Sequence, residues 1–223
     1  MGTQRDMFLE FEADAFFARE RAEGNELRER ISGDLVLNAL ESAGVEPCSV
    51  LELGSSDGWR LAALQQRLPK GVMVGLDPSR VALADGATRF PGVDHLCGTA
   101  EQLPFADRSF DLVILGFCLY VVDRDDLFRV AAEVDRVVAT SGFVAILDFH
   151  SETPLRRPYR GIAGRHSYKM NCGAMFAWNP AYQRIYQQLA PHPGSRVDDL
   201  EDQVAVTILK RDPDRAYRDC SVR

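Results

Sequence analysis

The sequence predicts an α/β fold built on a mostly parallel, doubly wound sheet. Short apolar runs alternate with stretches of helical apolar periodicity between residues 48 and 149. The first apolar run ends in a glycine-containing turn that leads straight into a helical pattern, and the second ends in one carboxylate, Asp77. Strand, turn and helix in this repeating order are typical of a parallel sheet that helices cover on both faces.

The individual elements follow from these periodicities in chain order. Strands are expected at 48–54, 71–76, 93–97, 110–116, 143–149 and 203–210. Helices are expected at 6–21, 26–42, 57–68, 79–86 and 123–139. Asp123 would cap the last of these helices, and Ser141-Gly142 would end it. The stretch 179–190 stays open, because Asn179-Pro180 suits a helix start while its Tyr and Ile content also suits a strand.

A glycine-containing turn, Gly54 to Gly58, joins the first strand to the next helix. Its two glycines allow backbone conformations and close approaches that a side chain would block, and Ser55, Ser56 and Asp57 add polar groups. The amide groups at such a helix start face the crevice at the carboxyl end of the sheet. We interpret the turn as a nucleotide cradle, with a plain strand-to-helix turn as the alternative.

Asp77 ends the second predicted strand, about twenty residues after the turn. A carboxylate at this place lies beside the first turn and can accept hydrogen bonds from two ribose hydroxyls. The alternative is a cap for the helix that begins near Ser79. The spacing from the turn favours ribose binding.

Two further blocks complete a pattern of four. Gly98-Thr99-Ala100-Glu101-Gln102-Leu103-Pro104-Phe105 follows the third strand, and Ser109-Phe110-Asp111-Leu112-Val113-Ile114-Leu115-Gly116 contains the fourth. In this order the blocks resemble the class I S-adenosylmethionine-dependent methyltransferase family, from about Val50 to Phe149. The resemblance implies a Rossmann-like, seven-stranded sheet whose last strand, 203–210, is antiparallel. It also implies that S-adenosylmethionine is the cofactor.

The same resemblance assigns residues to each part of the methyl donor. The methionine moiety would be lined by Glu52, Gly54, Ser55, Ser56, Asp57 and Gly58. Asp77 would hold the ribose, Pro78 would flank the adenosine, and Ala100 and Glu101 would lie by the adenine ring. The pocket floor near the sulfonium would be Leu115, Gly116 and Phe117. Two positions depart from the family's pattern, because Ser56 replaces a glycine and Thr99 replaces an acid.

The acceptor side offers candidates for proton removal and for binding. A hydroxyl acceptor needs a base, and His150 directly follows the fifth strand at the edge where ligands bind. Asp148 faces the same side of the strand and could orient or replace it. Tyr120 stands where the resemblance places an acceptor-side aromatic group. The candidate acceptor wall comprises Arg156, Arg157, His166, Tyr168 and Lys169.

Arg156 and Arg157 indicate which kind of acceptor this wall would bind. Arginine presents paired donors that match carboxylate or phosphate groups, so the loop is interpreted as a clamp for an anionic acceptor. A solvated surface loop is the alternative.

Composition narrows the possible functions. The chain has 223 residues, of which 46% are apolar, and this fits one domain. Its expected parts are N-terminal helices at 1–46, which form either a lid or a packing layer, a cofactor core at 47–150, an acceptor-side insert at 151–202, and the last strand and tail at 203–223. The net charge of −7 argues against a nucleic-acid partner.

Without a long apolar run or a leader pattern, we expect a cytoplasmic protein without membrane contact. The five scattered cysteines indicate reduced thiols, and no metal site is expected.

These observations predict a methyltransferase that acts on a small, anionic or sugar-like acceptor by in-line transfer. Two alternatives stay open. A dinucleotide-dependent oxidoreductase would share the cradle and the ribose acid, although the third phosphate-binding glycine is missing. A noncatalytic module that keeps the fold is the other, suggested by Ser56 and Thr99. The acceptor atom and the oligomeric state are left open.

Overall fold

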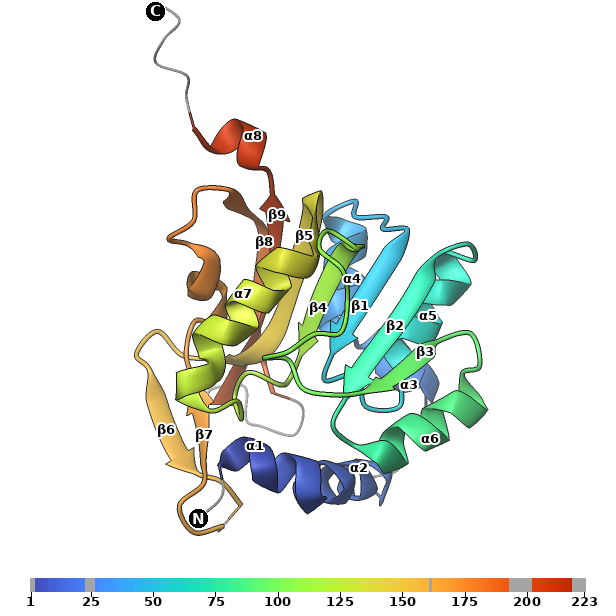
Figure 1. Cartoon of the computed structure of the whole chain (residues 1–223), viewed down its shortest axis with the longest axis vertical. Helices are drawn as coiled ribbons and strands as arrows, with labels where there is room; N and C mark the ends of the chain where they lie inside the picture. Colours follow the sequence, from blue (N-terminus) through green and yellow to red (C-terminus); the bar gives the residue numbers. More distant parts are fainter. Residues whose placement is uncertain (1–2, 23–26, 161, 193–201, 218–223) are drawn as a thin grey trace, which may run out of the picture.

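The computed structural model describes residues 3–22, 27–160, 162–192 and 202–217. Within these ranges seven strands form one sheet in the order β3-β2-β1-β4-β5-β9-β8 (Figure 1). The strands are β1 (Ser49–Leu53), β2 (Val72–Asp77), β3 (Asp94–Cys97), β4 (Phe110–Gly116), β5 (Val138–His150), β8 (Tyr182–Pro191) and β9 (Gln203–Arg211). β9 runs antiparallel to both of its neighbours, and the other pairings in the sheet are parallel. The predicted fold class is therefore confirmed.

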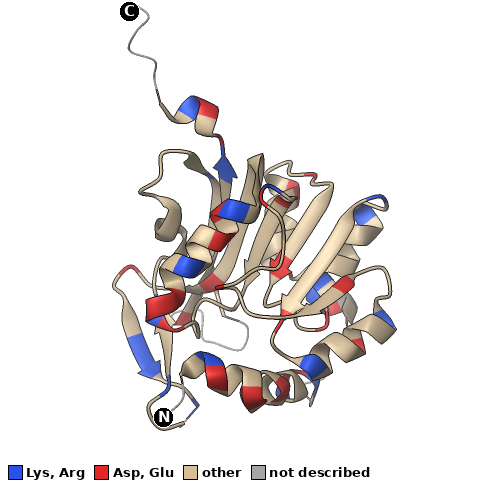
Figure 2. Ribbon diagram, viewed as in Figure 1, with Lys and Arg blue, Asp and Glu red and all other residues tan. Residues whose placement is uncertain are grey.

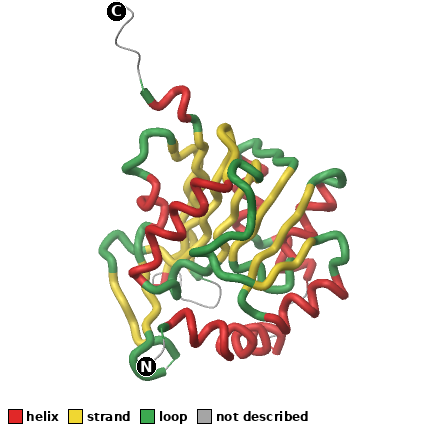
Figure 3. The backbone as a smooth tube through the Cα atoms, in the orientation of Figure 1, coloured by secondary structure: helices red, strands yellow, loops and turns green. Residues whose placement is uncertain are grey.

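Helices cover both faces of this sheet (Figure 3). They are α1 (Gln4–Met7), η1 (Phe8–Glu12), α2 (Ala13–Ala22), α3 (Leu27–Ser32), α4 (Leu35–Ser42), α5 (Trp59–Arg67), α6 (Arg80–Arg89), η2 (Arg124–Asp126), α7 (Leu127–Val137), η3 (Cys172–Phe176) and α8 (Pro213–Ala216). α7 and η3 pack on one face, and α4 and α5 pack on the other. Alternate residues of β1 enter opposite layers, with Leu51 facing α7 and Val50 facing α4. A separate hairpin pairs β6 (Leu155–Pro158) with β7 (His166–Lys169).

Two helix predictions are wrong at their boundaries. The single helix expected at 26–42 is divided, because Asp34 adopts an extended backbone and its carboxylate caps α4 through the Leu37 N–H at 2.9 Å. The helix expected to reach Ala139 ends at Val137, since Val138 is already extended and begins β5. Gly142 lies inside that strand, where a side chain would come within 2.8 Å of Val138.

Two further expectations are corrected or decided by the structure. The stretch 179–190 contributes a strand, β8, and the helical alternative is wrong. Asp123 forms no side-chain cap for η2, and its carboxylate accepts the backbone N–H of Arg5 at 3.1 Å instead. No helix in the described ranges combines the length and apolar character needed to cross a membrane.

The N-terminal helices lie beneath the carboxyl ends of the strands (Figure 1). At one end, the Gln4 amide donates to the His166 carbonyl at 3.0 Å, and the Gln4 side-chain oxygen accepts the His166 N–H at 3.2 Å. Further along, the Asp14 carboxylate accepts the Ser79 hydroxyl at 2.7 Å, close to the start of α6. The helical segment therefore bridges the hairpin and the β2–α6 connection, across the edge where the predicted site residues gather.

Candidate active site

The turn after β1 has the backbone geometry of a close-approach loop. Gly54, Ser56 and Gly58 have φ values of 75°, 52° and 76°. A side chain on Gly54 would come within 2.9 Å of the Gly116 carbonyl oxygen at the end of β4. Ser56 therefore occupies the left-handed conformation that glycine accepts without strain, which explains why the family's pattern has glycine there.

Asp77 joins this turn to the start of α6. One carboxylate oxygen accepts the Ser56 N–H at 2.8 Å, and the other accepts the Ser79 N–H at 2.8 Å. Ser79 caps α6 itself, through the Ala82 N–H. Burial raises the pKa of Asp77 to about 6, against the two backbone donors that lower it. The carboxylate thus lies against the turn and joins it to the start of α6.

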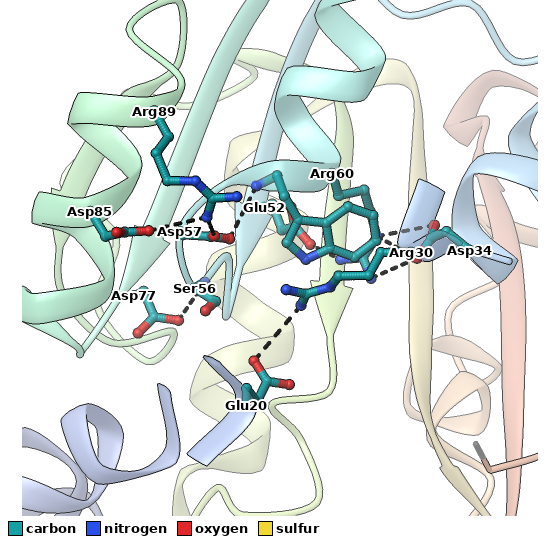
Figure 4. A network of polar contacts seen from close by, with 11 residues as sticks. Glu20, Arg30, Asp34, Glu52, Ser56, Asp57, Arg60, Asp77, Asp85 and Arg89 are labelled. Atoms are coloured by element: carbon teal, nitrogen blue, oxygen red, sulfur yellow. Dashed lines mark hydrogen bonds and ion pairs between the residues drawn. The ribbon is translucent and has the colours of Figure 1, made fainter. Parts of the chain in front are cut away.

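Glu52, at the end of β1, belongs to a buried charge network (Figure 4). Arg60 pairs with Glu52 and forms a bidentate contact with Asp34, with an Arg60–Asp34 distance of 2.9 Å. One guanidinium is therefore shared by two carboxylates. The second oxygen of Glu52 is buried with no hydrogen-bond partner among the described residues. Burial raises the pKa of Glu52 to about 7, and Arg60 partly opposes the shift.

Arg60 and Asp34 were not singled out from the sequence. Arg60 lies against the chain at Gly116, where a side chain would come within 3.0 Å of its guanidinium nitrogen and 2.9 Å of Glu52. Trp59 packs between the guanidinium groups of Arg30 and Arg60, at 4.8 and 4.9 Å from its ring centroid. The only sequence signal for this network is Arg60 itself, the second residue of the helix that follows the turn.

Two polar residues of the turn point away from the cradle. The Asp57 carboxylate is buried and pairs with Arg89 of α6 at 2.6 Å (Figure 4). The Ser55 hydroxyl points toward Gly75 of β2 and has no hydrogen-bond partner among the described residues. Both side chains therefore pack behind the turn. Only the backbone groups of Ser55 and Asp57 face the side where a ligand would bind.

The loop after β3 carries Ala100 and Glu101. The Glu101 carboxylate accepts the Thr99 hydroxyl at 2.7 Å and pairs with Arg5 of α1 at 3.3 Å. Ala100 packs against the apolar layer that includes α7. Thr99 therefore supports the neighbouring acid, and α1 closes on the same loop. Pro78 lies opposite, where its carbonyl oxygen is 3.8 Å from the Cys97 sulfur.

Asp148 and His150 lie close together at the end of β5, but they have different surroundings. Asp148 is 2% exposed and accepts the N–H groups of Leu119 at 2.8 Å, Tyr120 at 3.2 Å and Phe149 at 2.7 Å. It thus holds the loop after β4. Burial raises the pKa of Asp148 to about 7, against these donors. His150 places Nε2 3.1 Å from the exposed Glu152 carboxylate.

Both side chains line a small hollow that opens to solvent. η3 and β9 form its other walls, through residues that include Cys172 and Thr207. The hollow is polar on the β5 side, since Asp148 and His150 face it together. Burial raises the pKa of the Cys172 thiol, so this sulfur is a neutral wall rather than a nucleophile.

Aromatic side chains gather at the end of β4 and β5. This aromatic cluster comprises Phe117, Tyr120, Phe149, Tyr159 and His192. The Phe149 ring lies 5.6 Å from Phe117, 5.2 Å from Tyr120 and 4.9 Å from His192 between centroids. Burial raises the pKa of Tyr120 well above its ordinary value, so its hydroxyl stays protonated.

His192 is a site residue that the sequence reasoning missed. It follows β8, a segment whose helix or strand character was open, and no motif surrounds it. Phe117, the last residue of the predicted pocket floor, begins the aromatic cluster and has a positive φ of 50°.

The predicted basic wall is divided by the hairpin. Arg156 is exposed on β6, the outer strand, which carries the basic stretch seen in Figure 2. Lys169 lies on β7, is buried, pairs with Asp202 and places Nζ 4.5 Å from the Phe149 ring centroid. Lys169 therefore joins the aromatic cluster, whereas Arg156 does not.

The other members of the wall have separate contacts. Arg157 is half-buried on β6 opposite Ser167. The Tyr168 ring packs under the Arg124 guanidinium at 4.1 Å. His166 is tied to Gln4 through its backbone. Among the described residues, no group of three or more His, Cys, Asp and Glu side chains is arranged to hold a metal ion.

Known proteins match this core. Residues 50–142 match the family model described as a methyltransferase domain. This segment is a methyltransferase domain. The methyltransferase domain therefore covers β1 to the start of β5, and contains the turn, Asp77 and Glu101.

Curated relatives include two methyltransferases. A ubiquinone/menaquinone biosynthesis C-methyltransferase of Xanthomonas oryzae is 32% identical over 155 residues, which cover 65% of this chain and 59% of the relative. A malonyl-[acyl-carrier protein] O-methyltransferase of Methylococcus capsulatus is 30% identical over 146 residues, covering 61% of this chain and 50% of the relative. The chain thus matches between half and three fifths of the length of these relatives.

Solved structures share the fold over most of the chain. A 1,6-didemethyltoxoflavin-N1-methyltransferase of Burkholderia thailandensis, with S-adenosylhomocysteine bound, has a TM-score of 0.69 at 15% identity and covers 95% of this chain and 91% of its own. A second neighbour comes from a complex between the Haloferax volcanii Trm112 methyltransferase activator and a methyltransferase. It has a TM-score of 0.67 at 19% identity and covers 89% of this chain and 97% of its own. The predicted family and fold class of the domain are confirmed.

Proposed function

We propose that this chain transfers a methyl group from S-adenosylmethionine to a small acceptor. The observation that carries the proposal is the pairing of the positive-φ turn with Asp77, whose carboxylate accepts the Ser56 N–H at 2.8 Å. This pairing supports the proposal, because an acid held beside a glycine-containing turn can accept hydrogen bonds from ribose hydroxyls.

The surrounding residues fit the proposed cofactor. Glu52 keeps a buried oxygen without a partner among the described residues, beside a closely packed glycine, Gly116. An ammonium group is the natural partner for such an oxygen, and S-adenosylmethionine carries one. When bound, this cofactor supplies an electrophilic methyl group on a sulfonium.

The same charges argue against the oxidoreductase alternative. Glu52 and Asp77 lie beside the turn, whereas Asp57 points away from it and pairs with Arg89. A dinucleotide would bring a doubly charged pyrophosphate against these acids without a third glycine to admit it. A cationic donor is favoured by the same field.

The acceptor is proposed to be a flat ring that carries an anionic or hydroxyl group. The aromatic cluster offers ring faces and edges at the end of β4, beside the predicted sulfonium position. Lys169 supplies the buried cation nearest to these rings. The relative named for ubiquinone/menaquinone biosynthesis is consistent with a ring acceptor. A sugar-like acceptor remains the competing proposal from the sequence.

His150 is the proposed base, and Asp148 is proposed to position the loop that carries Tyr120. The His150 ring is buried beside the hollow, while its Nε2 reaches Glu152, which is exposed and could pass a proton to solvent. The bridge formed by α1, η1 and α2 across the strand ends supports their proposed role as a lid over both ligands.

Calorimetric titration with S-adenosylmethionine, S-adenosylhomocysteine and nicotinamide dinucleotides tests the donor assignment. Binding of the two adenosyl compounds alone is expected, and binding of a dinucleotide alone would overturn the proposal. Turnover is then measured as S-adenosylhomocysteine released with aromatic, carboxylate and sugar acceptors. His150→Ala should lower turnover about 100-fold with donor affinity unchanged, and unchanged turnover would remove His150 from the proposed mechanism.

A further inference from the structure

His95 occupies a slot walled by glycines beneath the donor turn. It lies on β3, directly opposite Gly75 of β2. A side chain on Gly58, the last residue of the turn, would come within 2.7 Å of the His95 Cε1 atom. A side chain on Gly86 of α6 would come within 2.6 Å of the same atom. The imidazole ring therefore fills the space that these glycines leave, and it supports Gly58 from below.

Both nitrogens of this ring lack hydrogen bonds. Nδ1 and Nε2 are buried and have no partner among the described residues. A neutral imidazole always carries one N–H group, and a protonated one carries two. Buried polar groups in folded proteins nearly always have a partner, so an unpartnered imidazole is unusual. Protonation would add a second buried donor and a charge to a slot that satisfies neither.

The charged groups around the slot do not compensate a positive ring. Asp57, in the turn above, is already paired with Arg89 at 2.6 Å. Asp85 of α6 also pairs with Arg89, at 3.1 Å. α5 begins directly after Gly58 and presents its positive end there, which disfavours a cation. On its own strand, the neighbouring Asp94 is exposed to solvent.

We propose that His95 is a positioning residue of the donor site, and that its neutral ring keeps the Asp57-Gly58 turn in its binding position. Protonation of the ring displaces the turn and weakens donor binding, so the affinity for the donor falls in acid. This inference rests on the proposed function, because it treats the turn as the donor cradle. His95 touches no reacting group and acts through Gly58.

The test compares the full chain with His95→Phe, which keeps an aromatic ring but has no nitrogen. The Kd for S-adenosylhomocysteine is measured by calorimetry at pH 7.5 and 5.5. Asp77, with a pKa of about 6, weakens binding in acid in both proteins. The wild type should lose about tenfold more affinity than His95→Phe over this range. Equal losses in the two proteins would overturn the proposal.

A control and a ligand-free measurement complete the design. Asp94→Asn removes the exposed acid next to His95 but keeps the ring, and it should lose affinity as the wild type does; a profile like that of His95→Phe would overturn the proposal. If His95→Phe does not fold, His95→Leu replaces it. Backbone amide exchange of residues 55–61 is followed in the ligand-free proteins at both pH values.

The exchange measurement separates failure of this inference from failure of the proposed function. If no protein binds S-adenosylhomocysteine at pH 7.5, the donor assignment fails. In that case the exchange of the amide hydrogens of the turn is compared in acid, after correction for intrinsic rates. Faster exchange in the wild type but not in His95→Phe would still support displacement of the turn by protonation of His95. The same exchange in both proteins would overturn it.

Discussion

Glu52 contacts Arg60 with one carboxylate oxygen and keeps the other buried without a partner among the described residues. Because Asp34 shares the same guanidinium, the buried network holds two acids for one cation. Burial raises the pKa of Glu52 to about 7, and the nearby Asp34 carboxylate adds to this rise. A bound ammonium group would favour the ionised carboxylate, so donor binding should release a proton.

The proton release can be measured directly. At pH 7 about half of the Glu52 carboxyls are protonated in the free protein, so binding of S-adenosylhomocysteine should release about half a proton. Calorimetry at pH 7 in phosphate and in Tris should give different observed enthalpies, in proportion to this release. Glu52→Gln should lose most of the difference. Identical enthalpies for the wild type in both buffers would contradict the expectation.

Asp77→Ala should weaken S-adenosylhomocysteine binding by about 10- to 100-fold. The change removes a carboxylate that is proposed to take the ribose hydroxyls and that also accepts the Ser56 and Ser79 N–H groups. Asp85→Ala is the matched control, because this acid lies on α6 and pairs with surface arginines. Donor affinity that is equally reduced in both variants would argue against a ribose contact.

Ser56→Gly should stabilise the protein by about 0.5 kcal/mol, because relief of the left-handed strain outweighs the extra freedom of the unfolded chain. Urea unfolding at constant pH measures the change. Ser42→Gly, at the exposed end of α4, is the control and should destabilise by a similar amount, since its backbone is helical. Destabilisation by both substitutions would mean that Ser56 carries no strain.

Asp148 should make the protein less stable as the pH rises. Its folded pKa of about 7 lies above the ordinary value of 3.8, so its contribution is fully present below pH 3.8 and is lost as the pH rises through 7. Between pH 6 and 8 this loss is about 1 kcal/mol. The free energy of unfolding in urea should fall by that much more in the wild type than in Asp148→Asn. Parallel pH profiles would show that Asp148 does not titrate between pH 6 and 8 in the folded protein.

Lys169→Met should weaken an anionic ring acceptor at least about tenfold, because the buried ammonium lies over Phe149 in the aromatic cluster. Arg156→Met removes an exposed cation from the outer strand of the hairpin and should change the same KM less than about twofold. The acceptor KM is compared at saturating donor, with donor Kd as the check on folding. A larger effect of Arg156→Met would restore the arginine clamp expected from the sequence.

The sequence determined the core of this protein. β4 occupies Phe110–Gly116, the range its apolar run predicts, and the turn from Gly54 to Gly58 meets Asp77 as the spacing requires. These features depend on local pattern, because strand burial, glycine conformation and a short crossover are encoded within a few residues of each other. The strand assigned to 203–210 was likewise found, as β9.

Only the tertiary structure decided the remainder. The segment 179–190 becomes β8 because it pairs along β9, and that pairing outweighs the helix start at Asn179-Pro180. Arg60 meets Asp34, Lys169 meets Asp202 and Phe149 meets His192 across 26, 33 and 43 residues of chain respectively. Such contacts arise from packing and from charge neutralisation between distant elements, which no local pattern encodes. The turn and its contact with Asp77 could therefore be predicted from the sequence, whereas the charge network behind the turn and the contacts of the aromatic cluster could not.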